Sequence, residues 1–146
     1  MSIKNKYDKV VLIIIIISAL IRGFIAHTVQ FGNDEVYYWT YALYPDLSHF
    51  DHPPMVGFVI QAFSLDLLFQ DEFFIRLGSI IFGAVNTCLV FIIGKKIKDS
   101  ITGLYAAFLY TSSIYAFIIC GVFILPDTPQ NLFWLLGIYF FISSLP

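Results

Sequence analysis

The sequence predicts an all-α fold, a polytopic bundle of transmembrane helices. Hydrophobic residues make up 59% of the chain and charged residues only 12%, about half the charged share of a typical soluble domain. Long apolar runs alternate with short polar segments, and most runs are long enough to cross a bilayer. A chain this apolar needs lipid as its solvent. Its small net charge of −2, with no basic stripe, argues against nucleic-acid binding.

The first apolar run covers residues 10–28. About 19 residues suffice for a helix to span a hydrocarbon core of roughly 30 Å. The run is too long for the core of a cleavable signal peptide, so we expect it to remain in the protein. Lys4, Lys6 and Lys9 precede it, and this basic flank predicts a cytoplasmic N-terminus.

Residues 29–72 are predicted to form one outer loop that carries two short juxtamembrane helices. The loop contains a second apolar run, residues 55–69, which is short for a membrane span and includes Asp66. The lysine-rich segment GKKIK, residues 94–98, should be cytoplasmic like the N-terminus, so an even number of crossings must separate the two. Residues 10–28 and 73–94 already supply two crossings. Residues 55–69 should therefore lie along the outer membrane surface.

Two further spans are expected at residues 101–125 and 130–146, with the short link between them exposed on the outer side. The last run stops without a polar tail, and we interpret residues 1–146 as the N-terminal part of a longer transmembrane domain. Cys88 and Cys120 lie inside apolar runs. We expect them to be small core side chains rather than disulfide partners or metal ligands.

The residues that could take part in catalysis or binding fall in three predicted outer segments. The segment richest in them is NDEVYYW, residues 33–39. Asp34 and Glu35 closely follow an apolar span. Desolvation makes ionised carboxylates energetically unfavourable there, so a functional role would explain their presence. A structural explanation carries equal weight. Asn33 could N-cap a helix whose first turn prefers acidic side chains, and the aromatic residues, Tyr38 among them, suit a membrane interface.

The second segment is HFDHPP, residues 49–54, whose prolines fix the backbone before the next helix. Asp51 and His52 could bind a metal, pair with each other or contact an anion, or they could be solvated groups of a capped loop. A zinc site is weakly supported, because His27, His49 and His52 lack a compact ligand spacing.

The third segment is LPDTP, residues 125–129, where Asp127 is expected to N-cap the last helix with Pro129 in its first turn. Two arginines lie in the outer parts of the first two spans. Arg22 and Arg76 could each snorkel to the interface, which we favour for a single arginine near a helix end. Alternatively, each could face the bundle interior and hold a carboxylate or a phosphate.

The order of these motifs resembles the dolichyl-phosphate-mannose-protein mannosyltransferase-like family of membrane glycosyltransferases, which has the GT-C fold. The matching features are an apolar span, NDEVYYW, FDHPPM in the same loop, FIRLGS, and LPD before another span. The resemblance implies two juxtamembrane helices in the first outer loop, in agreement with the crossing argument. It also implies transfer of a sugar, with inversion, from a polyprenyl-phosphate donor to a hydroxyl of a lipid, glycan or protein acceptor on the non-cytoplasmic side.

The resemblance further implies roles for individual residues. Asp34 matches the candidate general base, and Glu35 completes the acidic pair. Asp51 and His52 match the site near the carrier phosphate, and Asp127 matches a second acidic position that faces the same cavity. A divalent metal stays an open alternative. The remaining candidates for substrate binding are Tyr38 and Arg76.

Two other classes of function stay open, a transporter subunit or channel and a non-catalytic membrane scaffold. A transporter would be expected to hold its carboxylates near the bilayer midplane on broken helices, whereas the acidic residues here lie in predicted outer loops. The glycosyltransferase is therefore favoured. We expect it in the inner (plasma) membrane of a bacterium, with a periplasmic or extracellular site. Because family members are several times longer, we expect this chain alone to be inactive.

Overall fold

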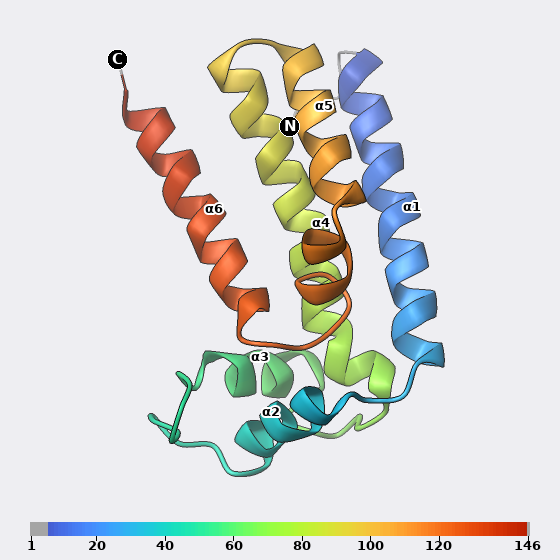
Figure 1. Ribbon diagram of the computed structural model, residues 1–146, viewed down its shortest axis with the longest axis vertical. Coiled ribbons are helices and arrows are strands. Elements are labelled where there is room, and N and C mark those ends of the chain that lie inside the picture. The colour runs from blue at the N-terminus through green and yellow to red at the C-terminus, as the bar shows by residue number, and fades with distance from the viewer. Residues whose placement is uncertain (1–5, 146) are drawn as a thin grey trace.

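The computed structural model describes residues 6–145 and is all-helical, which confirms the predicted fold class (Figure 1). The elements in chain order are α1 (Lys6–Thr28), α2 (Asn33–Leu43), α3 (Met55–Phe63), α4 (Glu72–Ile97), α5 (Ser100–Ser112), the π-helix η1 (Tyr115–Ile119) and α6 (Asp127–Ser144). Helices α1, α5 and α6 pack around α4, while α2 and α3 lie across one end of this bundle.

Two of the described helices, α1 and α4, are long and apolar enough to cross a membrane. Most of α1 is not covered by protein, and its outer face exposes large apolar side chains such as Leu20 and Phe24. Helix α4 is better covered because it contacts α1, α3, α5 and α6. An uncovered apolar face of this kind suits contact with lipid.

The start of α1 and the turn between α4 and α5 lie at the same end of the bundle, opposite α2 and α3 (Figure 1). An ion pair joins them, because Lys95 Nζ lies 3.2 Å from Asp8 Oδ1. This arrangement agrees with an even number of crossings between the two lysine-rich segments, while the crossings themselves stay a prediction. The side of the membrane that each end faces stays a prediction, and Lys4 lies outside the described residues.

Residues 101–125 do not form the single continuous helix that their apolar composition predicts. Asp99 caps α5 by accepting a hydrogen bond from the Thr102 amide at 2.8 Å, and the α-helix ends at Ser112. The backbone at Ser113 is extended, and the chain then winds into the π-helix η1 before it reaches α6. The break leaves a side chain of η1, Tyr115, within hydrogen-bonding reach of the start of α6.

The two helices of the outer loop are present, but their limits differ from the expected ones. Helix α3 ends at Phe63 rather than at residue 69, because Leu65, Asp66 and Leu67 have φ angles of 53°, 56° and 62°. These angles lie in the left-handed region, which cannot continue a right-handed helix. The Ser64 hydroxyl stabilises the turn by accepting a hydrogen bond from the Leu67 amide at 3.0 Å.

A glycine allows α2 and α3 to cross closely. A Cβ atom added to Gly57 would lie 2.8 Å from the Tyr41 carbonyl oxygen, so a side chain here would push the helices apart. The apolar core beneath this crossing includes Ile60 of α3, Ile75 of α4 and Ile124 of the segment before α6. The outer loop is therefore packed against the bundle rather than projecting from it.

Candidate functional site

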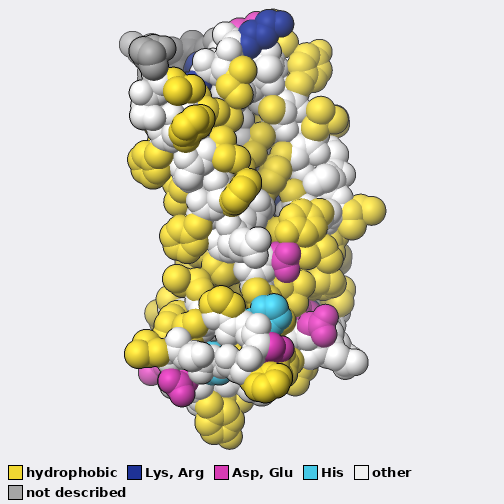
Figure 2. All heavy atoms as spheres, turned by 60° about the vertical axis from the view of Figure 1, so that its left-hand side comes forward, with side chains coloured by type: hydrophobic (Ala, Val, Ile, Leu, Met, Phe, Trp, Pro, Cys, Tyr) yellow, Lys and Arg dark blue, Asp and Glu magenta, His cyan; other side chains and the backbone are white. Residues whose placement is uncertain are grey.

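Acidic and histidine side chains gather at the end of the molecule formed by α2 and α3, while basic side chains mark the opposite end (Figure 2). This end includes the first turn of α2, the segment between α2 and α3, and the start of α6. These segments carry the three motifs that the sequence singled out. We describe them from the buried side outward.

A buried ion pair between Glu35 and Arg76 fixes α2 to α4. Arg76 donates from Nε to Glu35 Oε1 at 2.7 Å and from Nη2 to Oε2 at 2.6 Å, and the two residues are 0% and 2% exposed. Glu35 also accepts hydrogen bonds from the amides of Gly32 at 3.0 Å and Ile124 at 3.2 Å. Such a two-pronged arginine–carboxylate pair is among the stronger and more directional polar interactions. The Glu35 carboxylate thus connects the link between α1 and α2, helix α4, and the segment before α6.

The Gly32 bond also changes the expected cap of α2. The helix begins at Asn33, so Asn33 is its first residue and not its N-cap. The Glu35 side chain satisfies the free amide of Gly32 instead.

Arg76 does not snorkel to the interface as we expected. Its Nη1 donates to the carbonyl oxygens of Ala26 at 3.0 Å and Val29 at 2.5 Å, and its Nη2 donates to that of Gln30 at 3.1 Å. These carbonyls belong to the C-terminal end of α1, where a cation is favourable. The guanidinium is fully buried and bonded throughout by protein atoms, which leaves it no free donor for a substrate.

Arg22 also contradicts the snorkelling expectation, and its surroundings differ from those of Arg76. It is 0% exposed, and all three of its side-chain nitrogens lack a hydrogen-bond partner within the described residues. Its guanidinium lies 4.7 Å from the centre of the Phe117 ring. It fills space left by two glycines, since a Cβ on Gly83 or Gly121 would lie 2.6 or 2.7 Å from its nitrogens.

Asp34 directly precedes the buried Glu35 in α2, but the two residues differ in burial. Asp34 is exposed and makes no side-chain hydrogen bond or ion pair with the described residues. One turn later in α2, Tyr38 is almost buried. Burial raises the pKa of Tyr38, and the negative charges of Asp51, Asp34 and Asp127 raise it further. One carboxylate from each of the three motifs therefore disfavours ionisation of this tyrosine.

Asp51 is held by two tyrosines of α2. It accepts hydrogen bonds from the hydroxyls of Tyr41 at 2.6 Å and Tyr37 at 2.7 Å, and His49 stacks on Tyr41 with the ring centres 3.6 Å apart. The bonds from Tyr41 and Tyr37 lower the pKa of Asp51, so it stays ionised below the usual range of a carboxyl. The same contacts, together with burial, raise the pKa of Tyr41.

His52 lies where the outer loop faces α6. Its ring meets the Tyr38 ring edge-on, with centres 5.4 Å apart. It opens on a cavity of about 280 Å³. The other residues that line this cavity are Pro53, Met55, Val56, Pro126, Pro129, Gln130 and Phe133. Within residues 6–145, no three His, Cys, Asp or Glu side chains form a group suited to hold a metal ion.

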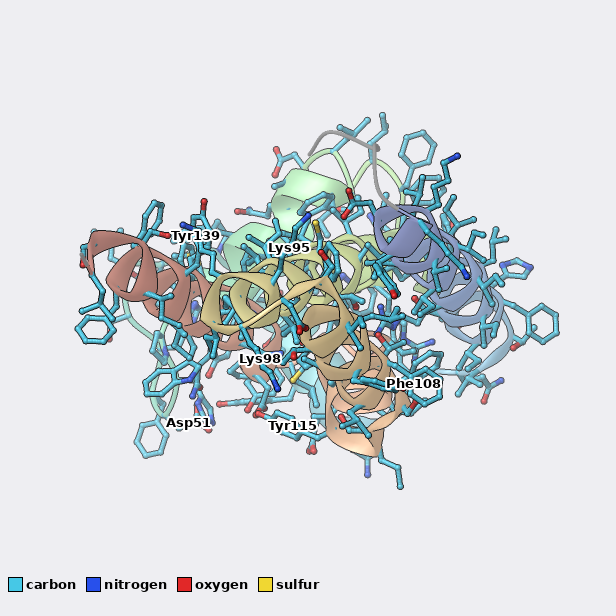
Figure 3. All side chains as sticks on the ribbon, turned by 90° about the horizontal axis from the view of Figure 1, so that it is seen from above. Asp51, Lys95, Lys98, Phe108, Tyr115 and Tyr139 are labelled. Carbon is cyan, nitrogen blue, oxygen red and sulfur yellow. The ribbon has the colours of Figure 1, made fainter. Side chains whose placement is uncertain are left out.

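Asp127 is the first residue of α6, one position inside the helix rather than its N-cap as expected, and Pro129 follows in the first turn. Its Oδ1 accepts a hydrogen bond from the Tyr115 hydroxyl of η1 at 2.7 Å. Seen along the bundle, Tyr115 and Asp51 lie on the same side of the molecule (Figure 3). The start of α6 thus faces both η1 and the outer loop.

A second cavity, which the sequence did not predict, lies beside α6. It has a volume of about 350 Å³ and is lined by Tyr115, Gln130, Asn131 and Trp134. The available signal was the helical spacing of polar residues in the last apolar run. Asp127, Gln130, Asn131 and Trp134 fall at i, i+3, i+4 and i+7, which places them on one face of a helix.

Comparisons with known proteins point to one family. Searches of the curated proteins and of the solved structures found no match. The model of the family described as dolichyl-phosphate-mannose-protein mannosyltransferase matches residues 51–145, a region that includes Asp51, His52, Arg76 and Asp127. This match covers well over half of the chain and, together with the two apolar helices, identifies a membrane protein. The chain belongs to the dolichyl-phosphate-mannose-protein mannosyltransferase family.

Proposed function

We propose that the protein transfers a sugar from a polyprenyl-phosphate donor to an acceptor hydroxyl on the non-cytoplasmic face of the membrane, with inversion at the sugar carbon. Family membership supports glycosyl transfer in general terms. Asp34 in the first turn of α2, Asp51 in the segment between α2 and α3, and Asp127 at the start of α6 lie at one end of the bundle, where His52 opens on a cavity, and this supports a reaction site there.

Asp34 is our candidate for the general base. In a single displacement the acceptor oxygen attacks the sugar carbon, and the bond from that carbon to the phosphate oxygen breaks. Asp34 accepts the hydroxyl proton, and the phosphate leaves with the bonding electron pair. Polyprenyl phosphate is already a good leaving group, so the protein mainly has to orient the acceptor and remove its proton. An exposed carboxylate that no protein donor occupies suits that task.

The observation that carries this proposal is the buried pair of Glu35 with Arg76. It anchors the first turn of α2, and Asp34 lies in that same turn. A base held within a fraction of an ångström of its working position gains most of the advantage of orientation. We therefore assign Glu35 and Arg76 positioning roles, in place of the catalytic and substrate-binding roles that their motifs implied.

His52 and Asp127 are our candidates for contact with the donor. His52 faces the cavity between the outer loop and α6, where an imidazole can donate to a phosphate oxygen in either protonation state. Asp127 lies in the first turn of α6, beside the cavity-lining Pro126 and Pro129. Asp51, tied to two tyrosines, keeps the segment before His52 in place.

Exchange of Asp34 for Asn tests the proposal. In the full-length protein, we expect Asp34→Asn to lower the rate of sugar transfer from a radiolabelled polyprenyl-phosphate donor by about 10²- to 10⁴-fold, because the proton acceptor is lost. Asp46→Asn is the matched control, since Asp46 is also exposed in the same outer loop. Normal transfer by a membrane-inserted Asp34→Asn protein contradicts Asp34 as the base. Uptake of a labelled solute without any transfer contradicts the glycosyltransferase as a whole and favours transport.

A further inference from the structure

We infer that the crevice between η1 and α6, lined by Tyr115, Gln130, Asn131 and Trp134, is the subsite that binds the sugar ring of the donor. This inference rests on the proposed function, since it names where the transferred sugar sits. With a volume of about 350 Å³, the crevice is at the small end of ligand sites, as suits a single sugar unit.

The polar side chains of this crevice need an explanation, because they lie on an otherwise apolar helix. Gln130, Asn131 and Trp134 share one face of α6 with Asp127. Further along the same face, Ile138 and Phe141 are apolar, so the polar character is confined to the first turns of α6. Amide side chains beside apolar surface usually face a hydrogen-bonding partner, a polar cavity or a ligand.

The crevice offers hydrogen-bond donors and acceptors of the kinds that sugar hydroxyls pair with. Asn131 donates from Nδ2 to the Tyr110 hydroxyl at 2.6 Å, which orients its carbonyl oxygen as an acceptor. The Tyr115 hydroxyl donates to Asp127, so its oxygen can accept. The Gln130 side chain forms no hydrogen bond within the described residues and offers both a donor and an acceptor.

Trp134 supplies the apolar part of the subsite. Its side chain is 70% exposed although it lines the crevice, so its indole is open to a ligand. A pyranose or furanose ring presents C–H groups on its faces and hydroxyls at its edge. A large aromatic face beside two amides binds that combination better than it binds a lipid chain.

Gln130 relates the subsite to the rest of the proposed site. It lines this crevice and also the cavity of about 280 Å³ that His52 opens on. With the sugar of the donor in the crevice and its phosphate near His52, the bond between them, which breaks in the reaction, would lie beside Gln130. Asp127, one turn before Gln130 on the same face of α6, lies next to that bond.

Tryptophan fluorescence tests the subsite without requiring turnover. The chain has two tryptophans, so Trp39→Phe leaves Trp134 as the sole reporter. In lipid nanodiscs, we expect a polyprenyl-phosphate sugar to shift or quench the Trp134 emission saturably, and bare polyprenyl phosphate to leave it unchanged. The same response to both carriers, or to neither, overturns the inference.

Equilibrium binding of radiolabelled donor and of radiolabelled bare polyprenyl phosphate to variants in nanodiscs completes the test, because Trp134→Ala removes the fluorescence reporter. We expect Gln130→Ala and Trp134→Ala each to raise the half-saturating donor concentration about tenfold, the equivalent of one lost hydrogen bond or stacking contact. Binding of bare polyprenyl phosphate should stay as in the wild type. Phe140→Ala is the control, since Phe140 is 64% exposed on the same helix but lines none of these cavities.

The outcomes separate this inference from the proposed function. Sugar-dependent Trp134 emission in this chain, with no transfer by the full-length protein, supports the subsite and contradicts the transferase. Transfer with wild-type donor affinity in the Gln130 and Trp134 variants supports the transferase and overturns the subsite.

Discussion

At the scale of single residues, two buried arginines in neighbouring spans are in opposite electrostatic situations. Arg76 is fully bonded, to Glu35 and to the end of α1. Arg22 is equally buried, but its nitrogens have no hydrogen-bond partner within the described residues. An unpaired buried charge costs several kcal/mol, which a contact with an aromatic ring offsets only in part. Replacing the two arginines should therefore change stability in opposite directions.

Arg76→Met is expected to lower the free energy of unfolding by about 3–5 kcal/mol, because it leaves the Glu35 carboxylate buried without its partner. Thermal unfolding in detergent measures the change. The double variant Glu35→Met with Arg76→Met is the control and should recover much of the loss, since no charge stays buried. A double variant less stable than the single one would contradict this account.

Arg22→Met is expected to raise thermal stability, because Met has a similar length and removes the cost of an unpaired charge. The phenyl ring of Phe117 can pack against the thioether instead. The comparison with Arg76→Met uses the same assay. A loss of stability as large as that of Arg76→Met would mean that Arg22 has a partner in the working protein.

At the scale of elements, the sequence predicted the long helices well and their interruptions poorly. Helices α1 and α4 lie within a few residues of the predicted spans, because a long apolar run allows little other structure in lipid. The end of α3 and the break after α5 lie inside apolar runs, where composition does not change. They depend on backbone angles at residues such as Leu65 and Ser113, which no hydrophobic pattern encodes.

The left-handed turn after α3 allows a direct test of its backbone strain. Leu65 has a φ of 53° and is 61% exposed. Its side chain therefore buries little apolar surface, while its Cβ strains the backbone in this left-handed conformation. We expect Leu65→Gly to stabilise the protein by roughly 0.5–1 kcal/mol, as the relief of strain exceeds the entropy that glycine loses. Leu68→Gly, at an exposed position without a positive φ, should be destabilising. Loss of stability in both variants would contradict the strained turn.

The crossing of α2 and α3 should be sensitive to a single methyl group. A Cβ on Gly57 would overlap the Tyr41 backbone, so Gly57→Ala is expected to cost about 1–3 kcal/mol. It should also slow sugar transfer, because α2 carries Asp34. Gly137→Ala is the matched control. Nothing lies within 4 Å of a Cβ at that position, so the substitution should leave transfer unchanged. Equal activity in the two variants would show that the crossing does not position the site.

At the scale of the whole molecule, the sequence predicted which residues share one end but not how they pair. The parity of crossings predicted that the motifs of Asp34, Asp51 and Asp127 share one face, and the segments that carry them lie at one end of the bundle. The partnership of Glu35 with Arg76 joins residues 41 positions apart. It depends on the angle at which α2 lies across the bundle, which a pattern of apolar residues does not specify.

The overall topology predicts that the two ends of the bundle are accessible from opposite sides of the membrane. Lys98 is exposed at the end of α4, and Leu47 is 85% exposed in the segment between α2 and α3. In a background with Cys88→Ala and Cys120→Ala, we expect a membrane-impermeant maleimide to label Leu47→Cys in intact cells. Lys98→Cys should react only after the membrane is permeabilised, because lysine-rich segments stay in the cytoplasm. The cysteine-free protein controls for background labelling. Labelling of both positions from one side would mean an even number of crossings between them, and would contradict the prediction that α4 spans the membrane. Labelling from opposite sides fixes the face at which donor and acceptor must be supplied.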